Sequence, residues 1–135
     1  MDCELGQPLA RYARIAGQVN TVVPDGDGGW YVGGAFVGAG GLPRANLVHV
    51  LADGSVTPWA PDPDGEVLAL ALVGRKLYVG GLFGHIGGQE RRSIAAVNAV
   101  SGAATDWNPG ADHKVLALLV HGDRLYVGGY FTAIG

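Results

Sequence analysis

The chain has 135 residues, the usual size of one domain, and 48% of them are apolar, which is enough for a buried core. A net charge of −3 and a single basic doublet, Arg91 and Arg92, argue against nucleic acid and anionic membranes as partners, since both need clustered positive charge. The one cysteine, Cys3, excludes an intrachain disulfide and a cysteine-based zinc site.

No membrane span is predicted, because every apolar run is far shorter than the ~20 residues that a spanning helix needs. The first residues (MDCELGQ) lack the basic start and apolar centre of a signal peptide. We therefore expect either a cytosolic chain or a piece of a longer one. The 24 glycines stand at fixed offsets from Tyr, Val and Phe, which predicts many tight turns between short strands.

Residues 1–18 are predicted to be the last strand of a preceding unit. The segment 8–15 (PLARYARI) alternates as a strand does and is expected to end at Ala16 and Gly17. This segment directly precedes the first strand of a unit, as residues 56–59 and 104–107 do later in the chain.

The remaining residues repeat one motif three times. Its copies start at Trp30 (WYVGGAF), Leu77 (LYVGGLF) and Leu125 (LYVGGYF), which stand 47 and 48 residues apart. Residues 66–87 and 114–135 are identical at 13 of 22 positions, which chance does not produce. A repeat of this length indicates an array of small supersecondary units. We divide the chain into complete units at 19–66 and 67–114 and a truncated unit at 115–135.

Each complete unit is predicted to hold four short antiparallel strands, in the second unit at about residues 67–73, 76–82, 93–98 and 103–107. Turn signals separate the strands, for example Asp-Gly at 53–54. Frequent turns and glycines disfavour helix, so the fold class is all-β.

The first strand of the second unit distinguishes between all-β architectures. Residues 67–73 (VLALALV) are apolar on both faces, whereas a half-exposed antiparallel strand would alternate. Sheets stacked face to face around an axis would cover both faces, so we predict β-propeller blades in an incomplete ring of about 2.75 units. Gly80 and Gly81 would lie where a neighbouring blade comes close. Trp59 and Trp107, 48 residues apart, would be large inserts between blades.

The repeat resembles a known family. The pattern V-x-A-L … LYVGG-x-F-x-x-IGG … R … IAAV … G … WNP is similar to the delta-sixty-type β-propeller repeats of large bacterial surface and secreted proteins, and similar repeats occur in a yeast cortical marker protein. The segment 24–34 resembles the unit that often opens such arrays. The resemblance covers residues 19–135. It implies a propeller in an extracellular or cell-surface setting, and it implies no catalytic residues.

Two functions remain open from the sequence. The first is a non-enzymatic interaction or scaffold module that binds protein or glycan. The alternative is a fragment of a propeller enzyme, either glycan-active or quinoprotein-like, because residues 96–107 resemble the tryptophan-docking motif of quinoprotein dehydrogenases. A glycan-active site would need converging carboxylates. Because so few units leave blade faces uncovered, we expect self-association or additional blades from a longer chain.

One candidate metal site precedes the first motif copy. Asp25 and Asp27, in the loop Asp-Gly-Asp-Gly-Gly, could present alternate carboxylates to calcium. A complete calcium loop needs a third ligand and a glutamate at its twelfth position, where this chain has Phe36. A polar hairpin turn is the alternative interpretation. Asp62 and Asp64 form a weaker version of the same pattern, and no other cofactor is predicted.

The histidines and the remaining arginines give no specific signal. None of the histidines stands at metal-ligand spacing from a cysteine or another histidine, so ordinary solvated or packed side chains are expected. We expect the arginines in ion pairs at blade edges or in solvated loops. These residues are His49, His85, His113, His121, Arg44, Arg91 and Arg92.

Overall fold

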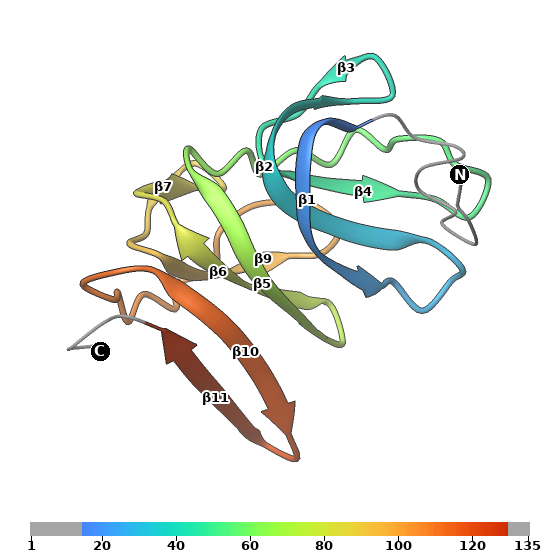
Figure 1. Ribbon diagram of the computed structural model, residues 1–135. Coiled ribbons are helices and arrows are strands. Elements are labelled where there is room, and N and C mark those ends of the chain that lie inside the picture. Colours follow the sequence, from blue (N-terminus) through green and yellow to red (C-terminus); the bar gives the residue numbers. More distant parts are fainter. Residues whose placement is uncertain (1–14, 130–135) are drawn as a thin grey trace.

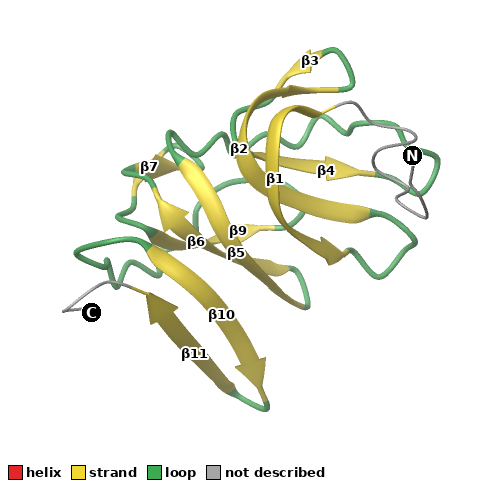
Figure 2. Cartoon of the chain, viewed as in Figure 1, coloured by secondary structure: helices red, strands yellow, loops and turns green. Residues whose placement is uncertain are grey.

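The computed structural model describes residues 15–129, and within them all regular structure is strand (Figure 2). This confirms the all-β prediction. The strands are β1 Ile15–Pro24, β2 Trp30–Ala39, β3 Leu42–Pro43, β4 Leu47–Val50, β5 Glu66–Val73, β6 Lys76–Leu82, β7 His85–Ile86, β8 Gln89–Glu90, β9 Ile94–Asn98, β10 Val115–His121 and β11 Arg124–Gly129. Residues 15–129 contain no helix of the length and hydrophobicity that a membrane crossing needs.

Three larger antiparallel sheets follow one another along residues 15–129, and β7 and β8 form a fourth, two-stranded sheet. The first contains β1, β2 and β4 with the short β3, the second contains β5, β6 and β9, and the third is the hairpin β10–β11. Strand β5 contacts β1 and β2, and β10 contacts β5 and β6. The second sheet therefore lies between the other two (Figure 1).

The sheets repeat down to single residues. Each first strand has a residue at the same motif position that bulges out of the pairing with the second strand, and these residues are Asn20, Leu68 and Leu116. Equivalent turns before β4 and β9 place Asn46 and Ser93 at φ values of 66° and 65°, outside the ordinary range for such residues. The backbone conformation therefore repeats with the same 47- and 48-residue period as the sequence.

The first half of the central strand β5 is covered on both faces. Val67 and Leu70 are 0% and 6% exposed in the cluster shared with the first sheet, and Ala69, opposite Gly80, is 7% exposed on the other face. The prediction is wrong at the end of the strand, where Val73 is 43% exposed. Its counterpart β10, at the end of the stack, has Leu119 62% exposed. Burial on both faces therefore depends on a neighbour on each side, which only β5 has among the described first strands.

The fourth strand of each unit is much shorter than predicted. In the first unit a single bridge joins Val56 to Val50, and in the second a single bridge joins Ala104 to Val97. Backbone hydrogen bonds from Thr57 to the His49 carbonyl and from Thr105 to the Ala96 carbonyl continue the pairing, and an arginine adds a further hydrogen bond to each segment. Arg44 Nη2 donates to the carbonyl of Thr57, 2.9 Å away, and Arg91 does the same to Thr105 at 2.9 Å. The expectation of an ion pair or a solvated loop is therefore wrong for Arg44 and Arg91, whose Nε atoms are buried.

The expected break at Ala16 and Gly17 is a bulge inside β1. The strand continues to Pro24, with a register shift between Ile15 and Gly17. The predicted strand at 8–15 falls almost entirely on residues 1–14, outside the described residues, as does the end of the third unit at 130–135.

The first glycine of each pair allows the sheets to approach each other. A Cβ on Gly80 would lie 2.6 Å from Cγ1 of Val115 in the next sheet. A Cβ on Gly33 would contact Val67 in the same way one unit earlier. This confirms the prediction of a close approach between neighbours for Gly80. The prediction is wrong for Gly81, where a Cβ would instead meet the Glu66 carbonyl oxygen of its own sheet. At Gly128, in the outermost sheet, the nearest atom would be 3.8 Å away.

We predict that Gly80→Ala lowers the free energy of unfolding by about 1–3 kcal/mol, because the added methyl overpacks the contact with Val115. Gly128→Ala is the matched control, at the same motif position with open space, and should change stability by less than about 0.5 kcal/mol. Urea unfolding followed by circular dichroism measures both. Equal effects of the two substitutions would show that the sheets do not meet at Gly80.

Candidate functional site

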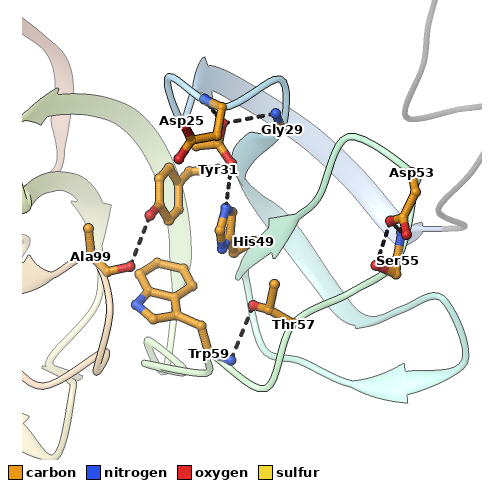
Figure 3. A network of polar contacts seen from close by, with 10 residues as sticks. Asp25, Gly29, Tyr31, His49, Asp53, Ser55, Thr57, Trp59 and Ala99 are labelled. Carbon is orange, nitrogen blue, oxygen red and sulfur yellow. Dashed lines mark hydrogen bonds and ion pairs between the residues drawn. The ribbon is translucent and has the colours of Figure 1, made fainter.

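A pocket of about 460 Å³ opens where the first and second sheets meet. Its walls come from the β1–β2 loop, from β2 and β4, from residues 57–59, and from the turn after β9 (Figure 3). The lining residues are Asp25, Asp27, Tyr31, His49, Thr57, Pro58, Trp59, Ala99, Val100 and Ser101.

Asp25 organises the β1–β2 loop. Its Oδ1 accepts hydrogen bonds from the backbone N–H groups of Asp27 at 2.7 Å and Gly29 at 2.9 Å. Such side-chain-to-backbone bonds are what make Asp a turn-forming residue. The carboxylate is 94% buried, since its side chain is 6% exposed.

The other oxygen of Asp25 binds a histidine. His49 Nε2 lies 2.8 Å from Asp25 Oδ2, and because a carboxylate only accepts, Nε2 carries the proton. The imidazole stacks on the ring of Tyr31, with centroids 4.3 Å apart and an interplanar angle of 14°. Tyr31 and His49 are cross-strand partners in the β2–β4 pairing. The stack is thus fixed by strand register and by the Asp25 hydrogen bond together.

Two aromatic side chains of the first unit bind the turn of the second. The Tyr31 hydroxyl donates to the carbonyl of Ala99 at 2.9 Å, and Trp59 Nε1 donates to the carbonyl of Asn98 at 3.0 Å. The Tyr31 and Trp59 rings meet edge to face at 5.0 Å. Each aromatic group therefore combines buried apolar area with a satisfied polar end. The pocket floor is part of the contact between the two sheets.

The pKa values of the site follow from burial and hydrogen bonding. Burial raises the pKa of Asp25, but the hydrogen bonds from His49 and the loop N–H groups outweigh it and leave the pKa below its ordinary value of 3.8. Burial, with the nearby negative charges of Asp25 and Asp27, raises the pKa of Tyr31. Asp25 is therefore a carboxylate at neutral pH, and Tyr31 keeps its proton.

The polar groups of the pocket can both donate and accept hydrogen bonds. Thr57 Oγ1 and Ser101 Oγ already accept from the N–H groups of Trp59 and Ala103, both at 3.3 Å, and each hydroxyl keeps an O–H that can donate. The Asp27 carboxylate, exposed at the rim, can accept.

The predicted metal residues Asp25 and Asp27 both lie at the pocket. Calcium there stays a prediction. Both oxygens of Asp25 already accept hydrogen bonds from the protein. Among residues 15–129, no group of three or more His, Cys, Asp or Glu side chains gathers closely enough to hold a metal ion.

The weaker acidic pair joins the first two sheets instead. Asp62 Oδ1 accepts from the N–H of Ala45 at 3.0 Å, and Asp64 Oδ1 accepts from the N–H groups of Gly84 and His85 at 2.7 and 3.0 Å. These hydrogen bonds attach the segment that links the first two units to one loop of the first unit and one loop of the second.

The remaining histidines lie away from the pocket. His85 Nδ1 lies 3.0 Å from Asp64 Oδ2 on an exposed loop. His113 Nδ1 accepts from the Lys114 N–H at 2.8 Å, and His121 is exposed at the end of β10. Only His49 enters the candidate site.

Sequence reasoning did not bring His49 together with Asp25 and Tyr31. A signal was present in the repeat. In the second unit the tyrosine of the motif, Tyr78, faces Ala96 across the strands. His49 occupies the equivalent position 47 residues earlier, so it is a departure from the repeat.

Both tryptophans are predicted to be large inserts between neighbouring units, and the structure buries Trp59 between the first two sheets but leaves Trp107 partly exposed. Trp59 is 5% exposed, whereas Trp107 is 37% exposed. Trp107 meets Tyr78 edge to face at 5.3 Å, much as Trp59 meets Tyr31. The difference is that the second sheet's turn covers Trp59.

Comparisons with known proteins give no match to this chain, whether with family models, with curated proteins or with solved structures.

We predict that Trp59→Ala lowers the free energy of unfolding by about 3–5 kcal/mol, because it removes a buried ring and leaves the Asn98 carbonyl without its indole donor. Trp107→Ala, at the equivalent position, should cost less than about 1 kcal/mol because the ring is partly exposed. Thermal and urea unfolding compare the two. A larger cost for Trp107→Ala would contradict the arrangement described.

We predict that Asp25→Asn lowers stability by about 1–2 kcal/mol at pH 7, because the His49 hydrogen bond loses its charge. The pKa of Asp25 is lower in the folded chain, so its contribution is complete above 3.8 and disappears as pH falls through the lowered value. Urea unfolding of both proteins between pH 7 and pH 2.5 should show the difference shrink in acid. Asp27→Asn, in the same loop but exposed, is the control; a difference that is independent of pH would refute the assignment.

Proposed function

We propose that the chain is a non-enzymatic interaction module built of consecutive β-propeller blades, part of a larger extracellular or cell-surface protein that binds protein or glycan. The repeat of sequence, bulges and turns supports the blade interpretation. The family resemblance supports the extracellular setting.

The observation that carries this proposal is the covered strand β5. A strand that is apolar on both faces and packed between two copies of its own unit is what stacked propeller blades require. Repeat arrays of this kind present loops and inter-repeat pockets as binding surfaces. Their function depends on the residues that depart from the repeat.

The pocket between the first two sheets is the proposed ligand site. The Asp27 carboxylate, the wall hydroxyls and the partly exposed His49 ring suit the hydroxyls of a glycan or the basic side chains of a protein segment. His49 stands where the second unit has alanine, so this position adds a polar group to one unit alone.

The proposal is tested by screening the chain against an immobilised glycan array and an array of basic peptides. We expect saturable retention on one array, weakened about tenfold or more by His49→Ala, the residue that the second unit tolerates at this position. Asp123→Asn, in the exposed β10–β11 turn, is the control and should bind as the unaltered chain does.

Retention that His49→Ala leaves unchanged, or retention on neither array, would refute the pocket as a binding site. Cleavage of a glycan in place of retention would favour the alternative, a glycan-active propeller enzyme.

A further inference from the structure

The chain contains four Asp-Gly steps, at residues 25–26, 27–28, 53–54 and 64–65. An aspartate that precedes a glycine can form a succinimide, a five-membered ring. The glycine nitrogen attacks the carboxyl carbon of the aspartate, and the displaced oxygen leaves as water. Glycine favours this step because it has no side chain to hinder the approach and few conformational limits. Hydrolysis at either carbonyl then opens the ring and yields aspartate or isoaspartate.

Hydrogen bonds hold three of the four carboxylates away from this reaction. Asp25 binds two loop N–H groups and an imidazole. Asp53 Oδ1 accepts from the backbone N–H and the hydroxyl of Ser55, at 2.9 and 2.6 Å (Figure 3). Asp64 binds two backbone N–H groups and an imidazole of the loop after β6. Each of these carboxylates must break such bonds before it can turn toward its own glycine.

The same hydrogen bonds keep the three carboxylates ionised. Burial raises the pKa of Asp25 and Asp64, but their hydrogen bonds outweigh it and leave the pKa below the ordinary value of 3.8. The hydroxyl of Ser55 lowers the pKa of Asp53. Because the displaced oxygen leaves as water only from the protonated acid, a lower pKa slows ring closure further.

Asp27 differs from the other three aspartates. Its side chain is exposed, and its carboxylate accepts no hydrogen bond within the part of the chain that the structure describes. Only its backbone N–H is bound, to Asp25 Oδ1. Exposure alone does not distinguish it, since Asp53 and Asp64 are exposed as well. The difference lies in the freedom of the Asp27 carboxylate to reach the nitrogen of Gly28.

We propose that Asp27 is a site of spontaneous modification, where the bond to Gly28 rearranges to an isoaspartyl bond while the other Asp-Gly steps of the folded chain stay intact. The rearrangement needs no co-reactant, because the water released on ring closure is taken up again when the ring opens. In the product the main chain runs through Cβ and Cγ of Asp27 and is longer by one methylene group. The former backbone carbonyl becomes the free carboxylate.

This modification changes the loop that carries the candidate pocket. Asp25 Oδ1 binds the N–H groups of Asp27 and Gly29, which lie on either side of the modified bond. The added methylene lengthens the chain between these two groups, so the loop has to change shape to keep both hydrogen bonds. The position of a rim carboxylate therefore changes as the protein ages. The proposal does not depend on ligand binding by the pocket.

The test is to incubate the folded chain for weeks at pH 7, digest it, and locate isoaspartate by chromatography and electron-transfer mass spectrometry. We expect about tenfold or more isoaspartate at residue 27 than at residues 25, 53 or 64, since freeing each of those carboxylates costs at least one hydrogen bond to a charged group. The same incubation in urea separates structure from sequence. Unfolding frees all four carboxylates, so the four steps should then react to a similar extent.

A variant of the protein gives a second measurement. Asp27→Glu keeps the charge, but its side chain would have to close a larger ring, which forms far more slowly. It should remove most of the isoaspartate that a protein isoaspartyl methyltransferase detects in the aged folded chain. Asp53→Glu is the matched control, in another exposed turn, and should leave that signal unchanged.

Three results would overturn the proposal: isoaspartate spread evenly over the four steps of the folded chain, none at residue 27, or a preference for residue 27 that persists in urea. The last would show that the sequence around Asp27 selects the site and that the hydrogen bonds of the other aspartates do not. Because the readout is the position of isoaspartate, none of these results bears on the proposed function of the pocket.

Discussion

The structure depends on close contact between successive sheets at the first glycine of each pair in the repeat. Where Gly33 faces Val67 and Gly80 faces Val115, the absence of a side chain lets the first strand of one unit lie against the second strand of the unit before. The apolar residues in the first half of β5 then find protein on both faces. Without that approach, burying β5 would leave voids that cores of normal density do not tolerate.

The pocket is a consequence of this contact combined with a local departure from it. Tyr31 and Trp59 bind the turn of the next sheet and so set the distance between the two units. Into this shared geometry the first unit adds Asp25 and His49, which the second unit does not repeat. Residues that repeat from unit to unit hold the sheets together, and residues that differ between units can contribute to ligand binding.

Much of the fold could be predicted because local and periodic signals carry it. The apolar faces of residues 67–73 indicate a strand covered on both sides, and the motif glycines indicate close approach. The sequence predicts longer fourth strands than the structure has, because the arginine that helps to hold each segment acts across 13 or 14 residues, which no local pattern reveals. The sequence does not predict the exposure of Trp107, because the burial of this ring depends on whether a turn of another unit packs against it. The pairing of Asp25 with His49 joins a loop to a strand 24 residues later, so only the three-dimensional structure shows it.

The most direct test of the central claim is a nuclear Overhauser spectrum of the isotope-labelled chain. Stacked sheets predict strong cross-peaks between the Val67 methyls and the Gly33 Hα protons, and between the Val115 methyls and those of Gly80. The same spectrum should show no exchange of magnetisation from water to the methyls of Val67, which is fully buried. Cross-peaks confined within each sheet, with the Val67 methyls in contact with water, would contradict the account.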